Sequence, residues 1–308
     1  MATRQEIERA AKILRDGGVV AFPTETVYGL GANALNEPAI ARIYRIKGRP
    51  STSPLIVHVP STEDVRQVVS EWPDIAEVLA RRFWPGPLTL VLRKRPELPT
   101  IVTAGLHTVG VRVPAHPVAL ELLSVAKVPV AAPSANRFTE VSPTEASHVR
   151  DSLGEGPDMI LDGGPANVGI ESTVLSLVGP QPVLLRPGMV GISQLEDLIG
   201  SIQFAGESSD EPHASPGLHA KHYSPRTRVV IGPPSPGLRS GYLWRKAEIS
   251  AARNLQMPLD PSGYAQKLYA ALHGLDQAGL DEIAIEPVPD GEEWSAIRDR
   301  LQRASSTR

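Results

Sequence analysis

The sequence of 308 residues contains no cysteine. Disulfides, thiolate catalysis and cysteine-based zinc or iron–sulfur sites are therefore excluded. No apolar run approaches the ~20 residues that a membrane span needs, and the first residues lack the apolar stretch of a secretory signal. We therefore expect a soluble, cytoplasmic protein that makes no contact with a membrane.

Aromatic residues make up only 5% of the chain, and the formal net charge is −3. Neither number favours a protein whose main role is to bind nucleic acid. The chain also lacks the GxxxxGK[ST] phosphate loop, the GxGxxG dinucleotide fingerprint and the GxSxG nucleophile elbow. His219 and His222 do not have a recognised zinc spacing, so we predict no metal site formed by the protein itself.

Three segments of different composition follow one another along the chain. Residues 1–204 alternate apolar strands with amphipathic helices, which predicts an α/β fold with a largely parallel or mixed sheet. Residues 205–227 are rich in Ser, Pro, Gly and His and have no apolar period, as is typical of a linker. Residues 228–308 again alternate strands and helices, which predicts a small C-terminal α/β domain.

The first strand leads into a polar loop. Residues 19–22 are apolar and predict a buried strand, after which Thr24 and Thr26 lie in a loop that the two glycines of residues 28–31 close. Hydroxyls at the C-terminal edge of a sheet can bind a small polar substrate. The alternative is an ordinary turn with incidental hydroxyls.

A basic loop follows the second helix. Asn36 can cap this helix, and Gly48 ends it, so that Lys47 and Arg49 face a loop. Lysine supplies a compact charge and arginine a bidentate fork, and together they suit a phosphate. The alternative is structural, because cations at a helix C-terminus also complement the helix dipole.

Two further strands carry polar side chains. A lone histidine such as His58 in the apolar run LIVHV is usually a core residue with its hydrogen bonds satisfied. Thr108 and Arg112 lie on one face of a later strand, because side chains alternate between faces. A buried arginine needs an anionic partner, which can be an internal carboxylate or a substrate carboxylate.

The chain after the strand at 128–132 offers small hydrogen-bonding groups. Ser134 and Asn136 suit a phosphate or a ribose. Ser142 is predicted to cap a helix together with Glu145, in a capping-box pattern. A helix N-terminus can also bind an anion, so this role of Ser142 stays open.

Several longer motifs follow one another along the chain: FPTETVYGLG, IKGRP followed by PLIVHV, WPGPLTLVL, VGVRVP, APSAN, SPTEASHV, ESTV and LLRPG. Together they resemble a known family, the YrdC-type threonylcarbamoyl-AMP synthases. The shared motifs occur in the family's order, and the match extends over about residues 5–200. The linker and the C-terminal segment resemble the longer, two-domain members.

The resemblance implies a twisted, mixed YrdC-like sheet flanked by helices, with a small Rossmann-like α/β domain after it. It implies that L-threonine, bicarbonate or CO2, and ATP give threonylcarbamoyl-AMP and pyrophosphate. The implied threonine-binding residues are Thr26, His58, Arg112, Ala132 and Ser172. The implied ATP-binding residues are Lys47, Arg49, Ser53, Thr108, Ser134, Asn136, Ser142, Arg186, His222 and Tyr223.

By the same resemblance, the product feeds the tRNA threonylcarbamoyl-transferase machinery, and a weak direct contact with tRNA is left open. Catalysis would depend on positioning and on charge neutralisation by Lys47 and Arg49, with Mg2+ accompanying ATP and no tightly bound organic cofactor. The alternative function is an RNA-binding module that uses the basic residues of 42–49. A carbamoyl-transfer relative used in metallocentre maturation is disfavoured, because such proteins carry zinc-finger segments and this chain has no cysteine.

Overall fold

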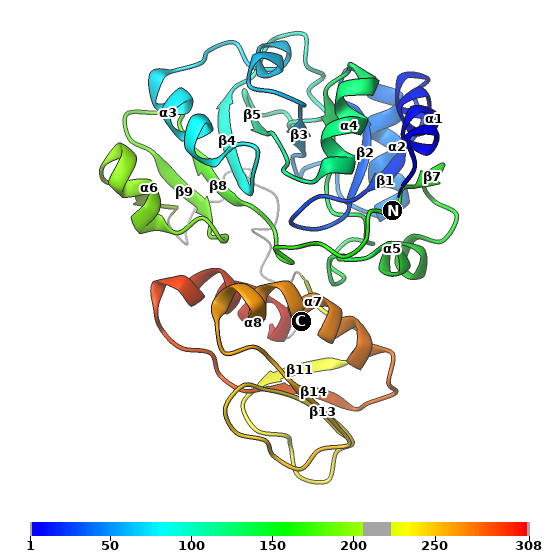
Figure 1. Cartoon of the computed structure of the whole chain (residues 1–308), viewed down its shortest axis with the longest axis vertical. Coiled ribbons are helices and arrows are strands. Elements are labelled where there is room, and N and C mark those ends of the chain that lie inside the picture. The colour runs from blue at the N-terminus through cyan, green and yellow to red at the C-terminus, as the bar shows by residue number, and fades with distance from the viewer. Residues whose placement is uncertain (1, 206–222, 307–308) are drawn as a thin grey trace.

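The computed structural model describes residues 2–205 and 223–306. It contains two sheets, one in each part of the chain (Figure 1). None of the described helices is long and apolar enough to cross a membrane. Most of the predicted linker, residues 205–227, and with it His222, lies outside the described residues.

The first part folds around a mixed sheet of ten strands in the order β10-β9-β8-β4-β5-β3-β6-β2-β1-β7. Its strands are β1 (Val20–Phe22), β2 (Gly29–Asn33), β3 (Ile56–His58), β4 (Leu88–Arg93), β5 (Thr108–Arg112), β6 (Val130–Ala131), β7 (Met159–Ile160), β8 (Thr173–Ser176), β9 (Val183–Arg186) and β10 (Gln203–Phe204). Its helices are α1 (Arg4–Arg15), α2 (Glu37–Lys47), the short 3-10 helix η1 (Glu63–Gln67), α3 (Asp74–Phe83), α4 (Pro117–Ala126), α5 (Ala146–Leu153) and α6 (Ile192–Ile199).

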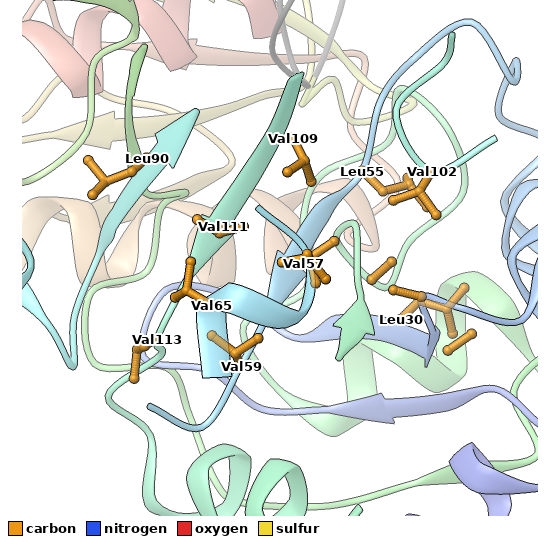
Figure 2. Packing of buried hydrophobic residues seen from close by; sticks show 14 of the residues in the cluster. Leu30, Leu55, Val57, Val59, Val65, Leu90, Val102, Val109, Val111 and Val113 are labelled. Atoms are coloured by element: carbon orange, nitrogen blue, oxygen red, sulfur yellow. The ribbon is translucent and has the colours of Figure 1, made fainter. Parts of the chain in front are cut away.

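Apolar side chains cover this sheet on both faces. One cluster contains Val57 of β3, Leu90 of β4 and Val111 of β5, all fully buried, and Figure 2 shows them among their neighbours. A separate cluster joins α1 and α4 to β1. The predicted mixed α/β fold is therefore confirmed, and its strands are apolar on both faces because helices cover both.

The glycines after the first strand belong to a strand and not to a loop. Gly29 and Gly31 lie in β2, which pairs antiparallel with β1. A side chain at Gly31 would come within 2.7 Å of both Phe22 and Val130. The predicted loop that carries Thr24 and Thr26 is present, and the two glycines that follow it belong to β2, where they make room for neighbouring side chains. The predicted caps of α2, Asn36 and a left-handed Gly48, are confirmed.

The second part contains four parallel strands in the order β11-β14-β12-β13. Figure 1 shows its two longer helices, α7 and α8, between this sheet and the first part of the chain. The predicted small α/β unit is confirmed. The elements are β11 (Arg228–Ile231), β12 (Ser240–Trp244), β13 (Arg253–Gln256), α7 (Pro261–Asp276), β14 (Glu282–Ile285), the short 3-10 helix η2 (Glu292–Trp294) and α8 (Ser295–Ser305).

The two parts share an apolar cluster. It joins Val27, Val141 and Ile170 of the first part to the buried faces of α7 and α8. Beside this cluster, His148 of α5 stacks on His273 of α7, with ring centroids 3.9 Å apart. The His273 Nε2–H donates to the carbonyl oxygen of Ser142 at 3.1 Å.

This histidine pair predicts a loss of stability in acid. Burial, helped by the neighbouring His148, lowers the pKa of His273 to about 4 from its ordinary 6.5, and burial also lowers the pKa of His148. The unfolded chain therefore takes up protons that the folded protein does not. The free energy of unfolding should fall as the pH drops from about 6.5 towards 4.

Denaturant unfolding at a series of pH values measures this effect. His273→Asn keeps a donor for the Ser142 carbonyl but does not titrate, so its stability should fall less steeply over the same range. Equal slopes for the variant and the parent would contradict the assignment.

Candidate active site

One cavity opens where the polar ends of several strands meet. It is lined by residues of the turn after β1, the ends of β3 and β5, the segment after β6 and the segment before β8. The lining residues are Thr24, Thr26, Val27, Gly29, Arg49, Ile56, His58, Arg112, Ala132, Pro133, Ser134, Glu171, Ser172, Arg186 and Tyr223.

Strand pairing explains why these residues meet. β3 and β5 are parallel neighbours, and their register places His58 beside Arg112. β6 pairs with β3 on the other side, which leads Ala132 to the same place. The start of β8 adjoins the start of β4, which runs antiparallel to β5, so Ser172 lies close to the end of β5.

The threonines after β1 are arranged around Arg112. Thr24 Oγ1 and Thr26 Oγ1 are 2.8 Å apart, and the Thr24 hydroxyl donates to the carbonyl of Val27 at 2.6 Å. Arg112 Nη1 donates to Thr26 Oγ1 at 3.0 Å, and its Nε donates to the carbonyl of Gly86. The turn therefore presents its hydroxyls to the cavity in a fixed geometry.

Arg112 also has an internal carboxylate partner. Its Nη2 lies 2.6 Å from Glu25 Oε1, and both side chains are buried. Of the two partners considered from the sequence, the internal carboxylate is therefore present. Arg112 still lines the cavity, and neither Nη2 nor Glu25 Oε1 is aligned for a hydrogen bond, so the guanidinium can also receive a ligand carboxylate.

His58 is a neutral group in the cavity wall. Burial, together with Arg112, lowers its pKa to about 3. Within the described part of the chain, His58 Nδ1 has no hydrogen-bond partner. A buried polar atom without a partner is uncommon in folded proteins, so Nδ1 is an available contact for a polar ligand.

Arg49 provides a buried positive charge at the cavity. It is 6% exposed, burial lowers its pKa to about 10, and its Nη2 donates to the carbonyl of Pro54 at 3.2 Å. Its Nε has no hydrogen-bond partner and it forms no ion pair with any described carboxylate. A buried cation in this state is costly unless an anion binds it.

Arg186 and Ser172 also line the cavity and bond to each other. Arg186 donates from Nε to the Ser172 carbonyl and from Nη2 to Ser172 Oγ, each at 3.1 Å. Ser172 Oγ is also 2.7 Å from Thr89 Oγ1. These bonds hold the Ser172 hydroxyl and the Arg186 guanidinium in a fixed relation at the cavity edge.

Nine of the sequence-predicted site residues line this cavity. All five predicted threonine-binding residues are among them, with Arg49, Ser134, Arg186 and Tyr223 of the nucleotide set. The predicted residues Lys47, Ser53, Thr108, Asn136 and Ser142 do not line it, and His222 lies outside the described residues.

Lys47 contacts the segment that follows β6. Its ammonium donates to the carbonyl oxygens of Ser134 and Asn136, and burial lowers its pKa. It therefore holds the backbone of this segment in place. Asn136 has a similar role, since its Nδ2 donates to the carbonyls of Arg137 and Glu140.

The other three predicted residues, Ser53, Thr108 and Ser142, lie on different elements outside the cavity lining. Ser53 is buried in the turn before β3, and its carbonyl accepts from Tyr44. Thr108 begins β5, so it lies roughly 13 Å along the strand from Arg112 at the cavity. Ser142 does not cap a helix as predicted, because α5 begins at Ala146 and its N-cap is Glu145.

A buried charged group at the cavity, Glu171, was not predicted from the sequence. Glu171 accepts hydrogen bonds from Ser142 Oγ at 2.6 Å, Tyr269 Oη at 3.0 Å and Arg300 Nε at 2.8 Å. Tyr269 and Arg300 belong to α7 and α8. No sequence motif could have indicated them, since about 100 residues or more separate each from Glu171.

The models of two protein families together match nearly the whole chain. Residues 12–188 match the Sua5/YciO/YrdC family, described as "Telomere recombination". Residues 190–306 match the family described as "Threonylcarbamoyl-AMP synthase, C-terminal domain".

Two curated relatives are similar to this chain over nearly its full length. A threonylcarbamoyl-AMP synthase of Pyrococcus abyssi is 41% identical over 98% of this chain and 95% of its own length. One of Bacillus subtilis is 42% identical over 98% of this chain and 94% of its own length.

Solved structures show the same likeness. P. abyssi Sua5 complexed with L-threonine matches with a TM-score of 0.93 and 40% identity, covering 98% of this chain and 95% of that one. E. coli YciO matches with a TM-score of 0.53 and 26% identity, covering 60% of this chain and 90% of that one.

The fold and the polar cavity at its strand ends therefore define an α/β protein of the YrdC type. The chain belongs to the Sua5/YciO/YrdC family, in the form that also carries the threonylcarbamoyl-AMP synthase C-terminal domain.

Proposed function

We propose that this chain is an L-threonylcarbamoyladenylate synthase. It would form threonylcarbamoyl-AMP and pyrophosphate from L-threonine, bicarbonate or CO2, and ATP, for threonylcarbamoyl modification of tRNA. The observation that carries the proposal is a single cavity with two kinds of charge site. Arg112 beside Thr26 suits an amino-acid carboxylate, and Arg49, which lacks a carboxylate partner among the described residues, suits a phosphate.

The chemistry needs two steps. The amine of threonine attacks CO2 to give a carbamate and releases a proton. A carbamate oxygen then attacks the α-phosphorus of ATP, the bond to the bridging oxygen breaks, and pyrophosphate leaves. No protein nucleophile takes part, so the protein contributes positioning and charge neutralisation.

The residues at the cavity divide between the two substrates. Thr26, His58 and Arg112 would hold threonine, with the backbone at Ala132 and the hydroxyl of Ser172 nearby. His58 is neutral at pH 7, so it would orient the substrate by hydrogen bonding and not transfer a proton. Arg49 and Arg186 would neutralise the charge that develops on the leaving pyrophosphate. Ser134 and Tyr223 lie at the same cavity and would complete the nucleotide site.

Residues away from the cavity would act indirectly. Lys47 and Asn136 would position the segment that carries Ser134. Ser53, Thr108 and Ser142 were predicted as ATP contacts, and direct contact by any of them stays a prediction, as does contact by His222.

We propose that Mg2+ enters with ATP as part of the substrate. No group of three or more His, Asp or Glu in the described part of the chain could hold a metal ion. Phosphate oxygens and water are ordinary ligands of Mg2+. The transfer of the product to a tRNA-modifying partner, the cytoplasmic location and the division at residues 204 and 228 remain predictions.

Mass detection of the product tests the proposal directly. Protein mixed with ATP, threonine and bicarbonate should yield threonylcarbamoyl-adenylate, and 13C-bicarbonate should place the label in the product. Omitting threonine should abolish it. Salt-sensitive RNA binding without any adenylate would instead support the alternative RNA-binding function.

A further inference from the structure

Glu171 is a negative charge in a cavity proposed to take a polyphosphate. Among the described lining residues it is the only carboxylate, whereas three are arginines. It is also buried, at 7% exposure. An uncompensated carboxylate here would repel the nucleotide, and water could not screen it well.

The C-terminal part of the chain supplies the compensation. Arg300 of α8 is 1% exposed, and its Nε lies 2.8 Å from Glu171 Oε2. Burial acts to raise the pKa of Glu171, but the charges of Arg300 and Arg186 outweigh it and leave the pKa lowered. Glu171 is therefore ionised and paired at neutral pH.

The remaining contacts of Arg300 keep it in this position. Its Nη1 donates to the carbonyl of Pro187 at 3.1 Å and to Asp299 at 2.7 Å. Asp299 is in turn paired with Arg303. The network thus holds two cations and two anions, so the loss of Arg300 would leave one net negative charge beside the cavity.

Arg300 also contacts the cavity wall through an aromatic ring. Its guanidinium carbon lies 5.2 Å from the ring centre of Tyr223, which lines the cavity. The ring of Tyr223 stacks on that of Tyr269 of α7, with the ring centroids 5.8 Å apart. Both longer helices of the C-terminal part therefore support one wall of the cavity.

We propose that Arg300 is a positioning residue for the nucleotide. It neutralises Glu171 and supports Tyr223, so the C-terminal unit completes the electrostatics of a cavity that is lined mostly by residues of the first part of the chain. This proposal rests on the assignment of the cavity as the nucleotide site. By this proposal, the C-terminal unit contributes to nucleotide binding and does not only pack against the first part of the chain.

Substitution of Arg300 and Glu171, singly and together, tests the proposal. The readout is calorimetric binding of a non-hydrolysable ATP analogue with Mg2+. Arg300→Met should weaken binding by about 10- to 100-fold, because it leaves a buried carboxylate unpaired. Adding Glu171→Gln to Arg300→Met removes that charge and should restore affinity to within about threefold. Arg298→Met on the same helix is the matched control, since Arg298 bonds only to the carbonyls of Pro289 and Gly291 among the described groups.

Glu171→Gln alone keeps the proposal testable if Arg300→Met fails to fold. It should bind the analogue as tightly as the parent or more tightly. A loss of tenfold or more would mean that Glu171 serves the nucleotide directly, and would overturn the proposal. A double variant that folds but binds as weakly as Arg300→Met would overturn it too.

The binding assay does not depend on turnover. A parent protein that binds the analogue but makes no adenylate would refute the proposed function and leave the role of Arg300 to be decided by the variants.

Discussion

Replacing Arg49 with alanine should slow pyrophosphate release by about 100- to 1,000-fold at saturating threonine. Removal of one donor that stabilises developing charge has a cost of this size. Arg49 lines the cavity and has no ion pair with a described carboxylate. A coupled pyrophosphate assay, run over a range of ATP concentrations, measures the loss.

The same substitution should leave the fold nearly as stable as before. The substitution removes one hydrogen bond to the Pro54 carbonyl and a cation–π contact with Phe138. In that contact the guanidinium carbon lies 5.8 Å from the ring centre. Relief of a buried charge offsets that loss, since burial already lowers the pKa of Arg49. Arg45→Ala is the control, because Arg45 is an exposed residue of α2, the helix that precedes Arg49. Full activity in Arg49→Ala, or an equal loss in both variants, would refute the phosphate assignment.

Arg112→Gln should raise the KM for threonine by about 10- to 100-fold, the effect of losing a charge-assisted hydrogen bond to a carboxylate. It should also destabilise the protein by about 3–5 kcal/mol, because Glu25 would stay buried without its partner. The two effects must therefore be separated.

The double variant Glu25→Gln with Arg112→Gln separates them. Removing both charges should recover most of the stability, as measured by denaturant unfolding. The high KM for threonine should persist, and affinity for the ATP analogue should stay close to that of the parent. A normal KM for threonine in the double variant would show that Arg112 serves only Glu25.

Local patterns predicted local structure well. Asn36 and Gly48 bound α2 as expected, because a cap and a left-handed glycine act through their own backbone. Failures arose where packing decided the outcome. Gly29 and Gly31 suggested the closing residues of a loop, yet they lie in β2, and at Gly31 the side chains of Phe22 and Val130 leave no room for a Cβ.

Side-chain partners that are distant in the sequence could not be predicted from it. The charge of Arg112 indicated a need for an anion but not that Glu25 would supply it. Likewise, Ser142 had the pattern of a helix cap, but its hydroxyl donates to Glu171. Such choices depend on which strands become neighbours in the sheet, and no single segment carries that information.

The direction of a side chain was equally hard to predict. Gly48 was expected to expose Lys47 and Arg49 to one ligand, and only Arg49 lines the cavity. The two residues are two positions apart around a helix end, so they point to different places. Lys47 donates to the carbonyls of Ser134 and Asn136.

A crystal structure with threonine and a non-hydrolysable ATP analogue bound together tests the central claim most directly. Both ligands should lie in one cavity, with the threonine carboxylate against Arg112 and the nucleotide phosphates against Arg49. Ligands bound at separate places, or phosphates distant from Arg49, would contradict it.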